Sequence, residues 1–99
     1  YELDTWLFWS DVLTRNKDVH SAIEILLQGQ EFYPESAEIQ YKMAGFYLQI
    51  NETKKAQQRL TDALRINFDK RHLFEKEFPQ FGDMEWVKNI ISNIKKASR

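Results

Sequence analysis

The sequence predicts an all-α fold, a stack of antiparallel helical hairpins closed by a capping helix at its C-terminal end. Apolar residues recur at helical spacing along the chain, and no stretch alternates between apolar and polar residues as a strand would. The apolar pattern also repeats at a fixed interval, which is typical of stacked-repeat proteins. The chain has 99 residues, of which 42% are hydrophobic and 29% charged. Because this length supports one hydrophobic core, we expect residues 1–99 to form a single soluble domain.

The first hairpin is predicted from two amphipathic segments separated by a polar break. Residues 3–14 and residues 19–32 each place their apolar side chains on one side of a helix. Asp18, which lies in the break, is placed to accept backbone N–H groups as the N-cap of the second helix. Residues 33–36 contain Pro34 and end that helix.

The second hairpin shows the same organisation. Apolar residues between Ile39 and Leu48 mark a third helix, and residues 51–53 form a polar turn. The fourth helix is marked by a stripe of small and large apolar residues: Ala56, Leu60, Ala63 and Leu64.

Comparison of the chain with itself aligns the two hairpins when Leu3 is placed on Ala37 and every later residue is shifted equally. Residues of one size class then coincide: Trp9 with Met43, Ser10 with Ala44, Leu13 with Tyr47, Ala22 with Ala56, Leu26 with Leu60, Gly29 with Ala63 and Pro34 with Phe68. Small residues at three positions of each unit let two helices cross closely, because a larger side chain there would separate the helix axes. We therefore predict two repeats, residues 3–36 and residues 37–70.

This pattern resembles the tetratricopeptide repeat (TPR) family, whose helix-turn-helix unit has a signature of large and small residues ending in Pro. The first unit matches all eight signature positions: Trp6, Trp9, Ser10, Leu13, Ala22, Leu26, Gly29 and Pro34. In the second unit Gln40 stands where a large apolar residue is usual, and we expect Ile39 and Tyr41 to replace it. Phe68 stands where Pro is usual. The resemblance implies a TPR-like α-α superhelix, a right-handed solenoid of antiparallel hairpins.

Residues 71–99 are predicted to form a degenerate third unit and the capping helix. The helix that starts near Lys70 should end near Phe78, because Pro79 cannot continue it, and Gly82 should extend the break. Asp83 is expected to be the N-cap of a last helix. One side of that helix is apolar, as the terminal element of a solenoid requires: Trp86, Val87, Ile90, Ile91 and Ile94. Since the chain opens on Tyr rather than Met, we expect the C-terminal portion of a longer array.

Enzymatic chemistry is not expected, and we assign no catalytic, cofactor-binding or metal-binding residue. The chain has no Cys and no glycine-rich loop that could hold a phosphate. His20 and Glu24 lie at i, i+4 spacing on one helix, but two ligands without a third make a poor metal site, and His72 has no partner at ligand spacing. The three Trp residues, including Trp86, fall at core spacing.

The resemblance to TPR proteins implies a binding groove on the concave face, lined by the first helix of each hairpin. The residues expected there are Asp4, Leu7, Phe8 and Asp11 from the first unit and Glu38, Tyr41, Lys42, Gly45 and Leu48 from the second. This mixture of apolar and acidic groups suits a peptide or partner segment that carries Lys or Arg. One TPR subgroup binds chaperone tails through Lys, Asn and Arg, but Leu7, Asp11 and Lys42 depart from that set. In a longer array, upstream repeats of the same chain are the alternative partners of these side chains.

Charge is divided unevenly along the chain. Residues 1–36 hold 7 Asp/Glu and 2 Lys/Arg, a balance of −5, whereas residues 37–99 hold 8 and 12, a balance of +4. Basic residues on the fourth and last helices raise the alternative of an RNA-binding array: Lys54, Lys55, Arg59, Arg65, Lys88, Lys95, Lys96 and Arg99. Nucleic acid is disfavoured, because no stacking aromatics accompany them. A second alternative is self-association as a weak homodimer through an apolar and acidic N-terminal end: Glu2, Leu3, Asp4, Trp6, Phe8 and Asp11.

The sequence therefore predicts a non-catalytic protein-protein interaction scaffold that uses no cofactor. Its partner is expected to be a protein or peptide held in the groove. Apolar runs are too short to span a bilayer, so no membrane association is expected. The lack of Cys and of a secretory leader favours a cytoplasmic location.

Overall fold

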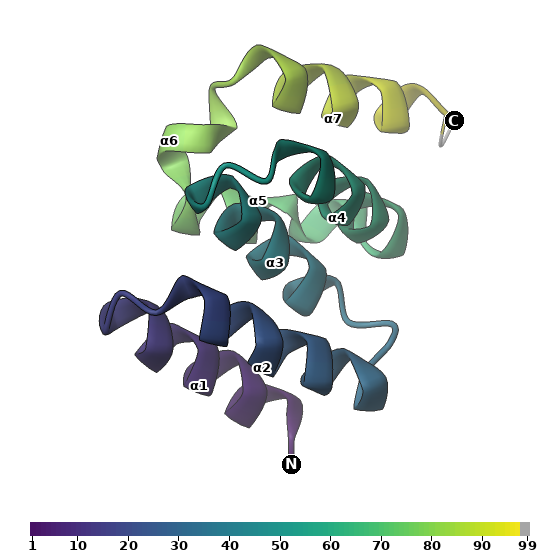
Figure 1. Cartoon of the computed structure of the whole chain (residues 1–99). Coiled ribbons are helices and arrows are strands. Elements are labelled where there is room, and N and C mark those ends of the chain that lie inside the picture. Colours follow the sequence, from purple (N-terminus) through teal and green to yellow (C-terminus); the bar gives the residue numbers. More distant parts are fainter. Residues whose placement is uncertain (98–99) are drawn as a thin grey trace.

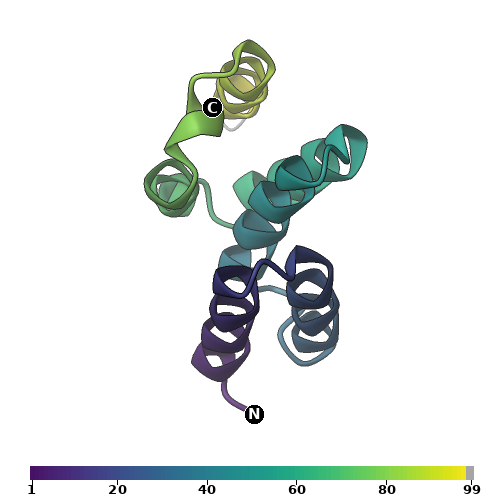
Figure 2. The same cartoon turned by 60° about the vertical axis from the view of Figure 1, so that its left-hand side comes forward.

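Seven α-helices and one 3₁₀ turn account for most of residues 1–97, the part of the chain that the computed structural model describes. These residues contain no strand, so the prediction of an all-α fold is confirmed for them. The helices follow one another along an elongated body of 36 × 25 × 21 Å, with the N-terminus at one end and the last helix at the other (Figures 1 and 2). Arg99, the last of the predicted basic residues, lies outside the described residues.

The first hairpin consists of α1 (Leu3–Arg15) and α2 (Val19–Phe32). Asp18 is the N-cap of α2, as predicted: its Oδ1 accepts a hydrogen bond of 3.1 Å from the backbone N–H of Ser21. Hydrogen bonding to Ser21 holds the pKa of the Asp18 carboxyl below its ordinary value. Lys17 makes the turn between the helices with a positive φ of 63°.

The second hairpin repeats the backbone of the first. It consists of α3 (Ala37–Gln49) and α4 (Thr53–Ile66), and the shift that places Leu3 on Ala37 also places both ends of α1 and α2 on those of α3 and α4. Asn51 has a φ of 62°, which matches Lys17 at the equivalent point of the first turn. The N-cap of α3 is Ser36, whose hydroxyl oxygen accepts a hydrogen bond of 3.2 Å from the N–H of Ile39. The helix ends therefore recur at the same interval as the sequence repeat.

Small residues allow the helices of each hairpin to approach closely. Ser10, Ala22, Ala44, Ala56 and Ala63 are fully buried at their repeat positions. At Gly29 a Cβ atom would lie 2.9 Å from Cγ of Trp6, so only glycine lets this indole pack against α2. Gln40 is buried between Ile39 and Tyr41, and both of these neighbours are buried as expected.

Ala56→Leu is expected to destabilise the chain by about 1–3 kcal/mol, because the larger side chain would overpack a fully buried position on α4. Gln58→Leu is the matched control, since Gln58 lies exposed on the same helix and its replacement should change stability by less than about 0.5 kcal/mol. Urea denaturation of both variants measures the difference. Equal losses would contradict the register of α4 derived from the repeat.

Trp9 corrects the predicted core. The repeat assigns this residue to a core position, but 43% of it is exposed, whereas its counterpart Met43 is fully buried. The reason lies in the surroundings of the two helices: α3 has α2, α4 and α5 packed around it, while α1 packs mainly against α2. One side of α1 is therefore left open. Trp86, also expected in the core, is only half-buried.

The third unit begins in register with the repeat and then departs from it. A 3₁₀ turn, η1 (Phe68–Lys70), precedes α5 (Arg71–Glu77). The helix ends at Phe78, as predicted, but Pro79 starts a further short helix, α6 (Pro79–Gly82), so Gly82 closes a helix instead of extending a break. Phe78 follows Ala44 by one repeat interval, where the pattern would place a small residue. A large buried ring thus stands where the first two units have Ser10 and Ala44.

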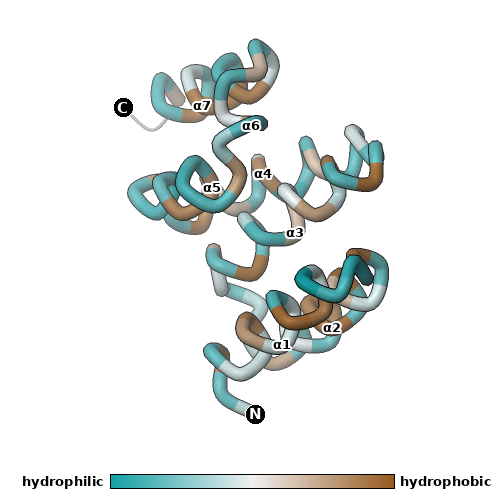
Figure 3. The backbone as a smooth tube through the Cα atoms, turned by 90° about the vertical axis from the view of Figure 1, so that its left-hand side faces the viewer, coloured by the Kyte–Doolittle hydropathy of each residue, from teal (hydrophilic) through white to brown (hydrophobic). Residues whose placement is uncertain are grey.

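The last helix, α7 (Glu85–Ala97), lies over α4 at the end of the molecule opposite α1 (Figure 1). Its apolar and polar residues alternate along the tube in Figure 3, and the apolar ones pack against the core: Trp86, Val87, Ile90, Ile91 and Ile94. The prediction that Asp83 is the N-cap of this helix is wrong. Asp83 has helical backbone angles as the C-cap of α6, whereas an N-cap residue needs a non-helical backbone.

Candidate functional site

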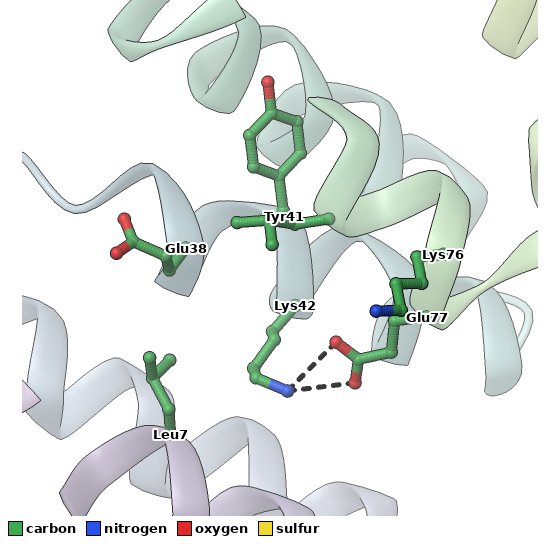
Figure 4. A pocket seen from close by; sticks show the side chains of 7 residues that line it. Leu7, Glu38, Tyr41, Lys42, Lys76 and Glu77 are labelled. Carbon is green, nitrogen blue, oxygen red and sulfur yellow. Dashed lines mark hydrogen bonds and ion pairs between the residues drawn. The ribbon is translucent and has the colours of Figure 1, made fainter. Parts of the chain in front are cut away.

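A pocket of about 430 Å³ lies between α1, α3 and α5. Figure 4 shows side chains from all three helices around it. Its walls are mostly apolar, and the lining residues are Leu7, Glu38, Tyr41, Lys42, Leu73, Lys76 and Glu77. Such a pocket is large enough for one or two side chains of a bound segment.

Lys42 connects the three helices that form the pocket. Its Nζ atom donates hydrogen bonds to Oδ1 of Asp11 at 2.6 Å and to both carboxylate oxygens of Glu77 at 3.0 Å. The Lys42 side chain is 14% exposed, whereas those of Asp11 and Glu77 are each 35% exposed. The ammonium group also lies 5.9 Å from the ring centroid of Phe46. Since one ammonium balances two carboxylates, this group of three charges is negative by one.

Burial raises the pKa of the Glu77 carboxyl above its ordinary value, even though the Lys42 ammonium acts in the opposite direction. Asp11, a second carboxylate nearby, raises the pKa of Glu77 further. The folded chain therefore binds the proton of Glu77 more readily than the unfolded chain does. The stabilisation from protonated Glu77 is present below its ordinary pKa and is lost as the pH rises through the raised value.

Tyr41 contributes its ring to the pocket and directs its hydroxyl away from it (Figure 4). The hydroxyl donates a hydrogen bond of 2.8 Å to the backbone carbonyl of Asn67. Burial raises the pKa of this phenol, so it stays protonated. On the other side, Glu38 forms an ion pair of 3.2 Å with Lys70.

The structure brings together four of the nine residues predicted for the groove: Leu7, Glu38, Tyr41 and Lys42. Asp11 lies beside them through its bond to Lys42, whereas Asp4 and Phe8 are exposed on α1 and do not line the pocket. Gly45 and Leu48 are buried, so a bound segment would not reach them. At Gly45 the reason is the ring of Phe78, which occupies the place where a Cβ atom would stand.

Three lining residues, Leu73, Lys76 and Glu77, come from α5 and are absent from the predicted set. Lys76 follows Lys42 by one repeat interval, so extending the repeat into the third unit would have found it. Leu73 and Glu77 do not lie one repeat interval after any residue predicted for the groove. Glu77 pairs with a lysine that is distant in the sequence, and no local pattern connects the two.

Some of the basic residues considered for nucleic acid take part in internal contacts. Arg59 donates hydrogen bonds of 2.8 Å to Oε1 of Gln30 and 3.1 Å to Oε1 of Gln40. The Lys55 ammonium lies 5.7 Å from the ring centroid of Tyr47. Arg59 is thus held against α2 and α3 and does not extend freely into solvent.

His20 and Glu24 line a small pocket of about 210 Å³ together with Tyr47 and Lys55. Within residues 1–97, no group of three His, Cys, Asp or Glu side chains could hold a metal ion. No helix in this part of the chain is both long and apolar enough to cross a bilayer.

Comparison with known proteins found one informative similarity. The BBSome complex member BBS4 homolog of Drosophila melanogaster is 32% identical to this chain over 65 residues. The chain resembles a segment of that protein. The aligned part is 66% of this chain and 13% of the relative, so the chain spans only a small part of the relative's length. No family model and no solved structure matches.

Proposed function

We propose that the chain forms a TPR-like α-α superhelix that serves as a non-catalytic scaffold for protein interactions. In this proposal the pocket between α1, α3 and α5 holds a peptide or a segment of a partner protein. The proposal rests on the pocket, whose apolar walls lie beside the ion pairs of Lys42 with Asp11 and Glu77. The helix ends that recur at the interval of the sequence repeat support the assignment to TPR-like units.

The chemistry of the pocket favours a segment with an apolar side chain next to a Lys or Arg. Leu7, Leu73 and the ring of Tyr41 offer surface to an apolar group. Asp11 and Glu77 share the single ammonium of Lys42, so a carboxylate remains for a cation of the ligand, although the exposed Lys76 lines the same pocket. The similarity to a protein described as a complex member is compatible with a protein partner.

Selection of peptides from a displayed random library on the immobilised full chain tests the proposal. We expect enriched peptides that combine apolar and basic residues. Leu73→Glu should weaken their binding at least about tenfold, because it places a charge in the apolar wall. The matched control is Gln58→Glu, which adds the same carboxylate at an exposed site on α4 and should leave binding unchanged.

Circular dichroism and thermal melting establish that both variants are folded before binding is compared. Leu7→Ser is a milder second variant of the same wall and should weaken binding in the same direction. Peptides that bind the Leu73→Glu and Leu7→Ser variants as tightly as the parent chain would show that the pocket is not the binding site.

A further inference from the structure

A second surface, separate from the pocket, carries exposed aromatic rings at the open end of the first hairpin. Trp6 lies between Trp9 and Phe32 in an arrangement that we call the aromatic ladder. Its ring stacks on Trp9 at 6.2 Å between centroids and on Phe32 at 5.9 Å, with interplanar angles of 21° and 16°. Tyr1 meets Trp6 edge-on at 5.6 Å. Trp6 is 4% exposed, but Trp9 is 43%, Phe32 66% and Tyr1 83% exposed.

Exposure of large apolar side chains is concentrated at this hairpin. Five such residues are exposed in residues 1–97, and four of them belong to α1, α2 or the residues before α1: Tyr1, Phe8, Trp9 and Phe32. The fifth, Met84, precedes α7 at the opposite end of the molecule. Contacts with Trp6 join three of them, Tyr1, Trp9 and Phe32, into one exposed aromatic surface, which is typical of an interaction site.

The surroundings of the aromatic ladder are acidic. The turn that carries Arg15 and Lys17 lies at the other end of the hairpin, because α1 begins and α2 ends beside the ladder. The acidic residues at the open end are all exposed, and none forms an ion pair in the described part of the chain: Glu2, Asp4, Glu31 and Glu35. The last turn of α2 holds no basic residue, so its free carbonyl groups add partial negative charge.

We propose that the aromatic ladder binds a basic segment of a partner protein that carries Arg or Lys next to apolar side chains. A guanidinium or ammonium group is attracted to the face of an indole or phenyl ring, and Trp9 and Phe32 each have one ring face that does not contact Trp6. The same cation can reach the carboxylate of Glu35, which lines one pocket together with Phe32. Apolar side chains of the segment would cover the remaining aromatic surface.

A second copy of this chain fits the surface less well. Its exposed basic residues on α7, Lys88, Lys95 and Lys96, supply positive charge. However, the apolar side of α7 packs against the core, and the exposed side between these lysines carries Asn and Ser. Within residues 1–97, Met84 is the one exposed large apolar residue next to that helix. The surface therefore requires a partner in which basic and apolar side chains are exposed together.

Titration of the full chain with a synthetic amphipathic peptide of Leu and Arg tests this inference. The indole N–H resonances in NMR spectra report on both ends of the molecule. We expect the resonances of Trp9 and Trp6 to shift and that of Trp86, on α7, to stay in place. A matched peptide with Glu for each Arg should not bind, and one with Ser for each Leu should bind about tenfold more weakly. Added salt should weaken binding of the Arg peptide.

Two variants test which residues of the ladder and its surroundings contact the peptide. Phe32→Ser, an exposed position, should weaken binding of the Leu-Arg peptide by about fivefold to tenfold, as should the double change Glu31→Gln with Glu35→Gln. Met84→Ser, which removes the exposed apolar residue at the other end, is the control and should have no effect. Leu73→Glu should leave the shifts of the Trp9 and Trp6 resonances unchanged even where it weakens binding of the same peptide at the pocket, which separates the ladder from the pocket.

Two results would overturn the inference. One is binding of the Glu peptide as tight as that of the Arg peptide, because the acidic residues would then play no part. The other is a rise in mass with concentration in sedimentation experiments that is abolished by Phe32→Ser, since a second copy would then be the occupant.

Discussion

Phe78→Ala is expected to lower the free energy of unfolding by about 3–5 kcal/mol, a large part of the total stability of a domain of this size. Phe78 is buried where α5 meets α6. Its ring contacts those of Phe46, Phe74 and Phe81 at centroid distances of 5.6, 5.6 and 6.1 Å. Truncation would leave a cavity between α3 and the third unit. Helix α5, which forms one side of the pocket, would lose the contact of Phe78 with Phe46 on α3.

Urea denaturation measures this loss, and Phe8→Ala is the matched control. Phe8 is 61% exposed, so the same change there should cost less than about 1 kcal/mol. Gly45→Ala tests the contact from the other side, because its Cβ would overlap the Phe78 ring. Alanine normally favours a helix over glycine, so a destabilised Gly45→Ala variant would identify the overlap as the cause. Equal losses for Phe78→Ala and Phe8→Ala would contradict the packing.

Lys42→Met is expected to destabilise the chain by about 2–4 kcal/mol near neutral pH, because it keeps the length of the side chain but leaves Asp11 and Glu77 without a counter-ion. This range is below that of a fully buried pair, because the side chains of Asp11 and Glu77 are each still 35% exposed to water. Lys54→Met, at an exposed position on α4, is the control and should be nearly neutral.

The loss should depend on pH in a definite direction. The pKa of Glu77 is already raised in the parent chain, and removal of the ammonium raises it further. Protonation of Glu77 removes the uncompensated charge, so the destabilisation of Lys42→Met should shrink as the pH falls through that raised pKa. Combining Lys42→Met with Glu77→Gln should recover part of the stability at neutral pH. Denaturation at several pH values tests both expectations, and a loss that stays constant with pH would contradict them.

The parts of the fold that could be predicted from the sequence depend on local signals. The polar break with Asp18 and the spacing of Ala22, Leu26 and Gly29 determine where α2 begins and which side of it packs. Trp9 shows the limit of such signals. Its spacing is that of a core residue, but exposure depends on whether another helix packs on that side of α1.

The candidate site was predictable where it follows the repeat and unpredictable where the third unit departs from it. Leu7, Tyr41 and Lys42 lie on the first helices of the two hairpins, which the resemblance to TPR proteins assigns to the groove. The position of α5 depends instead on the packing of Phe78 against Gly45, a contact between residues distant in the chain. Without that contact, neither the burial of Gly45 nor the place of Glu77 can be known.

The ion pairs of Lys42 with Asp11 and Glu77 affect the local unfolding of the chain. The helices pack mainly against neighbours in the chain, but this one ammonium joins α1 directly to α5. Local unfolding of the α1–α2 hairpin must therefore separate Lys42 from Asp11, which changes the electrostatic environment of Glu77. A cation that binds either carboxylate alters the free energy of this opening, and by thermodynamic linkage the opening alters the affinity for that cation to the same extent. The change in ligand affinity when the hairpin opens and the change in the free energy of opening when the ligand binds are thus the same coupling free energy.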